Sequence, residues 1–431
     1  MKPFAREIVY VEPAALAAKL RGERHLTLLE SVMRHEHLGR YSYLACNPTA
    51  SLTECGSEEI REVLEAHKLE QVAGLPPFQG GIAGYISYEF ARNFEPLAKV
   101  PEFSRLCPDM MLHHYDTVIS FDHLQEKAWI VARHEAEADD LERLLKRKAT
   151  SMGSAVIENW QSNFSRTNYE AAVQKTIEYI LAGDIFQANI TQCFSADLPQ
   201  KFDAFAFYRR LREMNPATFA AYLDYGDVKI VSSSPERLVE VENRVAEARP
   251  IKGTRRRDVD EGRDAELIVE LQASRKDRAE NVMIVDLLRN DLSRIAKPST
   301  VKVPVLCGLE SYANVHHLVS VVRGDLRDGV DLVDVLRAVF PGGSITGAPK
   351  IRAMEIIAEL EGQARGVYCG AIGYLGFNGA CDLNIAIRTA LFTNQKAYVA
   401  GGGGITSRSD PALEYEESLT KIKKIMEAFS P

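Results

Sequence analysis

One lysine and one glutamate stand beside turns, where they could act in nucleophilic attack and proton transfer. Lys252 lies in the run Arg-Pro-Ile-Lys-Gly-Thr at 249–254, beside a glycine that permits close backbone approach to a ligand. Its amine becomes nucleophilic only if burial or nearby cations, such as the arginines at 249 and 255–257, lower its pKa from about 10.4. Glu236 ends a predicted strand and could be a general acid if burial raised its pKa. Taken alone, a surface lysine and a turn glutamate are the simpler interpretations.

A group of carboxylates could hold a divalent cation. Glu280 shares a helical face with apolar residues, so it is predicted to point towards apolar structure. Glu414, Glu417 and Lys421 fall on one face of a later helix, which an Asp-Pro pair is suited to begin. Mg²⁺ takes one or two carboxylates and keeps several waters. The alternative is a solvated helix with a Glu417–Lys421 ion pair, and spacing alone favours that alternative.

Glycine-rich runs and one arginine could bind an anion. The run at 341–350 lacks the Lys-Ser/Thr of a phosphate loop, so nucleotide binding is not expected, although an anion could bind at the following helix N-terminus. Gly401–Gly404 follow a predicted strand at 396–400 and could make a tight bend or present amides to a carboxylate. Arg388 lies in an apolar, strand-like run, where a buried guanidinium needs either a ligand carboxylate or an internal ion pair.

Histidine and cysteine patterns predict neither zinc binding nor thiol catalysis. The pairs at 113–114 and 316–317 lack a third ligand at zinc spacing. The seven cysteines include no CxxC pair and are expected to be reduced. Nothing around Cys369 supports a nucleophile, so any glutamine hydrolysis must come from another chain.

The elements that must position these residues indicate an α+β body. Residues 1–135 alternate short strand-like runs with turns, and 136–165 read as a connecting helix and linker. Residues 166–431 mix helices, as at 169–181 and 265–292, with strands that do not alternate in βαβ units.

Composition and charge exclude some functions. The 431 residues, 46% hydrophobic and 26% charged, are typical of a soluble globular protein. A net charge of −8 argues against nucleic-acid binding, but not against a small anion held by a few local cations. No run is long enough to span a membrane, and the N-terminus lacks a signal core, so we expect a cytoplasmic protein.

Several motifs occur together in an order that resembles one enzyme family. They are Asp-Ile-Phe-Gln-Ala-Asn-Ile at 184–190, Ser-Pro-Glu at 234–236, the run at 249–254, Ala-Glu-Asn-Val-Met-Ile-Val-Asp-Leu at 279–287, Thr-Gly-Ala-Pro-Lys at 346–350, Ala-Ile-Arg-Thr at 386–389 and the glycine tetrad. The chain resembles the chorismate-utilising enzymes, which include anthranilate synthase component I, aminodeoxychorismate synthase component I, isochorismate synthase and salicylate synthase. The resemblance implies two β-sheets packed as a central sandwich, with helices outside and two interleaved subdomains.

The same resemblance implies site residues. Mg²⁺ would be held by Glu280 and Glu417, with Glu414 close by, and His317 matches the active-site histidine of the family. The implied chorismate contacts are Gly253, Thr254, Tyr368, Arg388, Gly402, Gly403, Gly404 and Lys421.

Two positions distinguish the branches of the family. The water-activating lysine of isochorismate and salicylate synthases would fall at Ala188, which cannot be a base. Anthranilate synthases usually have alanine where this chain has Lys252, whereas many aminodeoxychorismate synthases have lysine. The closer resemblance is to the latter, with Lys252 similar to a covalent nucleophile and Glu236 to its acid.

That branch implies conversion of chorismate to 4-amino-4-deoxychorismate, for 4-aminobenzoate and folate synthesis. The ammonia would come from a glutamine amidotransferase subunit. Anthranilate synthase component I and a non-catalytic regulatory or binding subunit are the alternatives.

The N-terminal half is similar to segments that line a tryptophan pocket. The residues implied are Glu30, Ser31, Arg40, Tyr41, Ser42, Tyr43, Thr218 and Phe219. However, Met-Asn-Pro-Ala-Thr-Phe at 214–219 departs from the Asn-Pro-Ser-Pro-aromatic pattern of feedback-inhibited anthranilate synthases. Inhibition by tryptophan is therefore not expected, although a structural tryptophan could bind.

Overall fold

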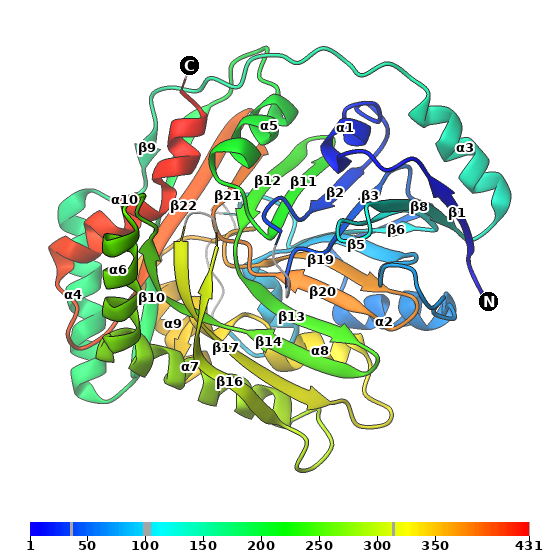
Figure 1. Ribbon diagram of the computed structural model, residues 1–431. Coiled ribbons are helices and arrows are strands. Elements are labelled where there is room, and N and C mark those ends of the chain that lie inside the picture. Colours follow the sequence, from blue (N-terminus) through cyan, green and yellow to red (C-terminus); the bar gives the residue numbers. More distant parts are fainter. Residues whose placement is uncertain (35–37, 98–104, 313–314, 431) are drawn as a thin grey trace.

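Two large antiparallel β-sheets form the body of the protein, and helices cover their outer faces (Figure 1). The computed structural model describes residues 1–34, 38–97, 105–312 and 315–430. Apolar side chains from both sheets meet between them, for example Tyr85 and Ile372 from one sheet with Leu223 and Ile230 from the other. This is the α+β sandwich predicted from the sequence.

The first sheet joins strands from both halves of the chain. In spatial order they are β1 (Phe4–Ile8), β8 (Lys127–Ala132), β7 (Thr117–Asp122), β3 (Tyr41–Ala45), β2 (Leu26–Glu30), β11 (Phe219–Tyr225), β12 (Val228–Ser234), β21 (Thr389–Thr393), β22 (Lys396–Ile405), β10 (Gln187–Asp197) and β18 (Gly347–Ala348), with β9 (Gln161–Ser162) beside β10. The halves meet where β2 pairs with β11.

The second sheet is mixed in the same way. Its order is β15 (Ile251–Arg256), β17 (Val315–Asp325), β14 (Val245–Arg249), β13 (Arg237–Glu242), β20 (Cys381–Asn384), β19 (Ala371–Gly376), β5 (Gly81–Ile86), β6 (Met110–Tyr115) and β4 (Ala50–Thr53), with β16 (Lys302–Ser311) also on β17. Here β5 pairs with β19. Neither half could complete a sheet alone, so the two halves interleave.

The helices fall into groups according to the surface they cover. The first sheet carries α1 (Pro13–Ala17), α3 (Glu135–Leu145), α5 (Ala204–Met214) and α10 (Pro411–Ala428), and its β10 end carries α4 (Arg166–Ala182) and α9 (Lys350–Glu361). The second sheet carries α2 (Ser57–Ala66), α7 (Arg275–Ser293) and α8 (Leu332–Val339), with α6 (Glu261–Ala273) on β15 and β17. Short 3₁₀ turns occur at η1 (Tyr88–Asn93) and at η3 (Gly343–Ile345).

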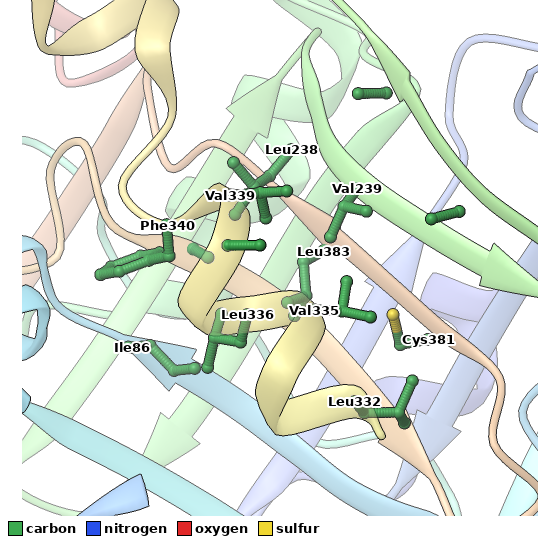
Figure 2. Close-up of a cluster of buried hydrophobic side chains, with 14 of the residues drawn as sticks. Ile86, Leu238, Val239, Leu332, Val335, Leu336, Val339, Phe340, Cys381 and Leu383 are labelled. Carbon is green, nitrogen blue, oxygen red and sulfur yellow. The ribbon is translucent and has the colours of Figure 1, made fainter. Parts of the chain in front are cut away.

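Helix α8 shows how a short helix is fixed to its sheet. The Asp331 side chain caps the N-terminus of α8 by accepting hydrogen bonds from the amides of Val333 and Asp334. Figure 2 shows its apolar face, including Leu336 and Val339, among side chains of β13 and β20. Each such aliphatic side chain contributes about 1.5–3 kcal/mol when fully buried.

Most predicted elements are present, with different boundaries. The helix predicted at 265–292 is two helices, because Ser274 ends α6 and its hydroxyl caps α7 by accepting from the Asp277 amide. The strand predicted at 396–400 continues through the glycines to Ile405. Within the ranges given above, no helix combines the length and apolar character needed to cross a membrane.

Buried His113 makes the fold sensitive to acid. Burial, helped by the stacked His25 ring at 4.1 Å and by Arg24, lowers the pKa of His113 to about 3. This folded pKa lies below the unfolded value of about 6.5. The contribution of neutral His113 to the free energy of unfolding is therefore complete above pH 6.5. It is lost as the pH falls towards about 3, by at most ~1.4 kcal/mol per pH unit.

We therefore expect His113→Gln to flatten the fall in unfolding free energy between about pH 7 and about pH 5, measured by urea denaturation. His134→Gln, at an exposed position, is the control and should keep the wild-type slope. Equal slopes for His113→Gln and the wild type would contradict this account.

Candidate active site

A cavity of about 400 Å³ brings most of the predicted site residues together. The walls come from both sheets and from α7 and α10. The predicted residues that line it are Glu236, Lys252, Gly253, Thr254, Glu280, His317, Tyr368, Arg388, Gly402, Gly404, Glu417 and Lys421. Gly403 and Glu414 lie beside this lining rather than in it, where a Cβ on the glycine would come within 2.7 Å of Glu414 Oε2.

Lys252 lines the cavity from β15, beside three carboxylates and a second lysine. Burial lowers the pKa of its amine, and the Lys421 ammonium lowers it further, against the opposing effect of Glu280, Glu236 and Glu417. The amine is therefore less basic than an ordinary lysine and closer to its nucleophilic form.

The arginines next to Lys252 in the sequence do not cause this shift, so that part of the prediction is wrong. Arg249 pairs with Glu310, and Arg257 donates to Asp264 across 2.8 Å. These side chains are neutralised away from the lysine. Desolvation, which a sequence pattern does not reveal, is the first cause.

Gly253 serves the packing of the protein as well as the cavity. Its φ of +84° is in the left-handed region that favours glycine. A Cβ there would lie 2.9 Å from the Asp277 Cβ and 3.0 Å from a Leu271 methyl group. The sequence pattern alone predicted only a role in ligand approach for this glycine.

Glu236 has the environment of a general acid. It follows the end of β12, lines the cavity and is 7% exposed. Burial raises the pKa of its carboxyl, although the Lys252 ammonium and the Ser344 hydroxyl oppose the rise. The direction is the one predicted from the sequence, and a raised pKa is the shift that a general acid requires.

His317 is held as a neutral ring. It lies opposite Thr254 in the β15–β17 pair, and its Nδ1 is 2.8 Å from the Thr254 hydroxyl. Burial and the nearby Arg388 guanidinium lower its pKa to about 4. At neutral pH it can therefore donate or accept a hydrogen bond but does not add a positive charge.

Arg388 is not in a strand, contrary to the prediction. It lies just before β21, in the connection from β20 of the second sheet to β21 of the first, and its φ is +51°. Burial lowers the pKa of its guanidinium, and Glu236 only partly offsets this. Among the described residues no carboxylate comes within 4.0 Å to form an ion pair with it. Of the two partners left open by the sequence, a ligand carboxylate is the better fit.

The glycine tetrad continues strand β22 and makes no bend. On one side it pairs with β10, from Gly401 opposite Gln192 to Gly404 opposite Asn189. On α10, the Lys421 ammonium binds the Gly402 carbonyl oxygen at 2.9 Å and Glu417 Oε1 at 2.7 Å. The Glu417–Lys421 ion pair expected as the alternative therefore forms, with the two side chains 47% and 43% exposed, and both side chains also line the cavity.

The carboxylates fit a divalent cation. Glu280 Oε1 and Glu414 Oε2 are buried without a hydrogen-bond partner, and the Lys276 ammonium lies 4.0 Å from Glu280 Oε1, so a cation or donor that binds closer would stabilise both carboxylates. Burial raises the pKa of Glu414; burial also acts on Glu417, but Lys421 outweighs it and lowers that pKa. Within the described ranges no three His, Cys, Asp or Glu side chains form a ready metal cluster. A cation here would complete its shell with water and substrate oxygens, as Mg²⁺ does.

Sequence reasoning missed Asn189, Ser344 and Lys276, which also line the cavity. The alternation of side chains along β10 would have placed Asn189 on the face opposite Ala188. Ala188 itself is packed in the apolar cluster under α4 and α9, so a lysine there would point away from the cavity. The argument against C2 hydroxylation drawn from Ala188 therefore loses its geometric basis.

Two packed sheets enclose a cavity lined by carboxylates, cations and glycines, which suits a small anionic substrate. The model of the chorismate binding enzyme family matches residues 28–427. The chain belongs to this family and is a chorismate-utilising enzyme.

Relatives with two different activities match at similar identity. Aminodeoxychorismate synthase component 1 of Salmonella typhimurium is 39% identical over 406 residues, covering 90% of this chain and 89% of the relative. Anthranilate synthase component 1 of Aquifex aeolicus is 36% identical over 450 residues, covering 96% and 90%. The crystal structure of anthranilate synthase component I from Streptococcus pneumoniae superposes with a TM-score of 0.81 at 33% identity, covering 90% of this chain and 92% of that one.

A second cavity, of about 320 Å³, contains the residues predicted for a tryptophan pocket. Those that line it are Glu30, Ser31, Arg40, Tyr41, Tyr43, Thr218 and Phe219. The exception is Ser42, whose hydroxyl faces His123 Nε2 at 2.6 Å and accepts from the Ser31 amide. Occupancy by tryptophan stays a prediction.

We expect the carboxylates to set the affinity for Mg²⁺. Glu417→Gln or Glu280→Gln should weaken Mg²⁺ binding, measured by calorimetry with chorismate present, by about tenfold or more because each removes a charged oxygen ligand. Glu416→Gln is the matched control, since that side chain is on the outer side of α10 beside Arg166 and is 56% exposed. Equal Mg²⁺ affinities for all three variants would contradict the assignment.

L-Tryptophan should stabilise the fold by binding the second cavity. We expect a rise in Tm with tryptophan concentration, because a ligand that binds only the folded state shifts the unfolding equilibrium. Turnover of chorismate should be unchanged at the same concentrations. Either an unaltered Tm or inhibition over that range would overturn the prediction.

Proposed function

We propose that the protein aminates chorismate to 4-amino-4-deoxychorismate, with Lys252 as a covalent nucleophile. The observation that carries the proposal is the position of Lys252 inside the cavity, facing the same space as Glu236 and the carboxylates of α7 and α10. An amine in that position can reach the ring of a substrate held by its carboxylates. The depressed lysine pKa and raised Glu236 pKa are the shifts such a pair requires.

Substrate binding follows from the charges in the cavity. Chorismate carries two carboxylates, and Arg388, without an ion pair among the described residues, offers a planar pair of donors for one of them. Glu280 and Glu417 would hold Mg²⁺, which when bound supplies positive charge for the other carboxylate. Lys421 orients Glu417 and the Gly402 carbonyl, so α10 and β22 stay in register around the substrate.

The chemistry balances with the residues present. The neutral Lys252 amine forms a bond to C2, the two conjugated ring double bonds shift to C1=C6 and C4=C5, and the C4 hydroxyl leaves as water with the Glu236 proton. Ammonia then adds at C4, both double bonds shift back, and the C2–nitrogen bond breaks to release the neutral lysine. The proton lost by the new amine returns to the Glu236 carboxylate. The net reaction exchanges a hydroxyl for an amine.

We propose a glutamine amidotransferase subunit as the source of ammonia. Both kinds of relative are named as component 1 of a synthase, which is a name for one part of an assembly. In this chain, burial raises the pKa of the Cys369 thiol to about 12, so it has no thiolate for glutamine hydrolysis at neutral pH.

Anthranilate synthesis is the second candidate, because relatives of that activity match at similar identity. Incubation with chorismate, Mg²⁺ and an ammonium salt separates the two. Anthranilate is fluorescent as formed, whereas aminodeoxychorismate gives 4-aminobenzoate only after a lyase is added. No turnover with excess ammonium would instead favour a non-catalytic subunit.

Replacing Lys252 should change the outcome of the reaction. We expect Lys252→Ala to lower formation of 4-amino-4-deoxychorismate about a hundredfold or more, because the covalent route is lost, and to allow some anthranilate. The measurement is product analysis by chromatography, with and without the lyase. Lys423→Ala, an exposed lysine on the outer face of α10, is the control for loss of one charge. Full amination at C4 by Lys252→Ala, with no anthranilate, would sink the proposal.

A further inference from the structure

A buried arginine lies behind the active-site cavity without lining it. Arg365, in the segment between α9 and β19, is 6% exposed. Its Nε and Nη2 donate to the two carboxylate oxygens of Glu361, at 2.9 and 2.6 Å, and the Tyr88 ring lies 4.7 Å from its guanidinium carbon. This part of the network is an ordinary buried ion pair.

The remaining contacts of the guanidinium go to the backbone of two cavity walls. Nη1 donates to the Ile345 carbonyl oxygen at 3.0 Å, and Nη2 donates to the Asn189 carbonyl oxygen at 2.6 Å. Both Asn189, from β10, and Ile345, from η3, line the active-site cavity. One rigid planar group thus joins two segments that are far apart in the sequence, and it adds to the direct bond from the Asn189 amide to the Thr346 carbonyl oxygen at 2.8 Å.

The arginine is itself fixed from two sides. Glu361 Oε1 also accepts from the Thr191 amide at 2.9 Å and hydroxyl at 3.0 Å, which ties α9 to β10. The Glu89 carboxylate accepts from the amides of Arg365 and Gly366, at 2.8 and 2.9 Å. Because every donor and acceptor is buried, a shift of the arginine would move both walls together.

We propose that Arg365 is a positioning residue that aligns the substrate ring by fixing the Asn189 and Ser344–Ile345 walls of the cavity that Lys252 also lines. This inference rests on the proposed function of the same cavity. The groups assigned to the substrate carboxylates are Arg388, before β21, and the proposed Mg²⁺ ligands Glu280 on α7 and Glu417 on α10, so they stand on other segments. Alignment of the ring and affinity for the dianion are therefore separable.

Arg365→Lys tests the proposal. The lysine keeps a positive charge beside Glu361, so the fold is retained, but an ammonium cannot reproduce the fork that holds two carbonyl groups. With saturating ammonium we expect kcat for chorismate consumption to fall about tenfold or more, as misaligned reacting groups do. The Kd for chorismate, measured by calorimetry, should change less than about threefold.

Arg21→Lys is the matched control. Arg21 also donates to a carboxylate, Asp203 at 2.7 Å, and to a carbonyl, Ser151 at 3.2 Å, and lies over an aromatic ring, but it does not contact the cavity. It should lose stability, measured as Tm, like Arg365→Lys, and keep the wild-type kcat. Equal kcat values for Arg365→Lys and Arg21→Lys would overturn the inference. So would a chorismate Kd of Arg365→Lys that rises by the same factor by which its kcat falls. Anthranilate as the wild-type product would overturn only the proposed function, because consumption counts either product.

Discussion

The placement of one partly desolvated amine among carboxylates is the constraint around which this molecule is arranged. Desolvation of Lys252 disfavours its charged form, while Glu236, Glu280 and Glu417 favour it. Lys252 is only half-buried by its accessible surface, and the three carboxylates offset the cost of withdrawing its charge from water. These opposing effects on the Lys252 amine act only if four elements lie close together. The elements are β13 with its preceding turn, β15, α7 and α10. The two interleaved sheets provide that meeting point.

The same construction places two cavities back to back. Glu236 lines the active-site cavity, and the next residue, Arg237, lines the second cavity. This follows from the alternation of side chains where β13 begins. Arg237 is held there by Asp382 and Glu240. The wall that presents the proposed general acid is thus shared with the cavity in which we predict tryptophan.

Sequence reasoning worked where chemistry and local periodicity act together. The shared face of Glu414, Glu417 and Lys421 and the cap of α10 by Asp410 follow from helical spacing and an Asp-Pro start. It did not give the φ of Arg388, the continuation of β22 through four glycines, or the orientation of Ala188. Those depend on pairing with β10 and on contacts between distant segments. The role of Arg365 was invisible for the same reason, since its partners Asn189 and Ile345 are brought to it only by the fold.

A covalent bond to Lys252 is the most direct test of the account. The protein is incubated with chorismate and Mg²⁺ without ammonium, quenched in acid, and analysed by intact mass and peptide mapping. The account predicts an added mass equal to chorismate less one water, carried by the peptide that contains Lys252. A protein that aminates chorismate when ammonium is present, yet never carries that mass on Lys252, would contradict it.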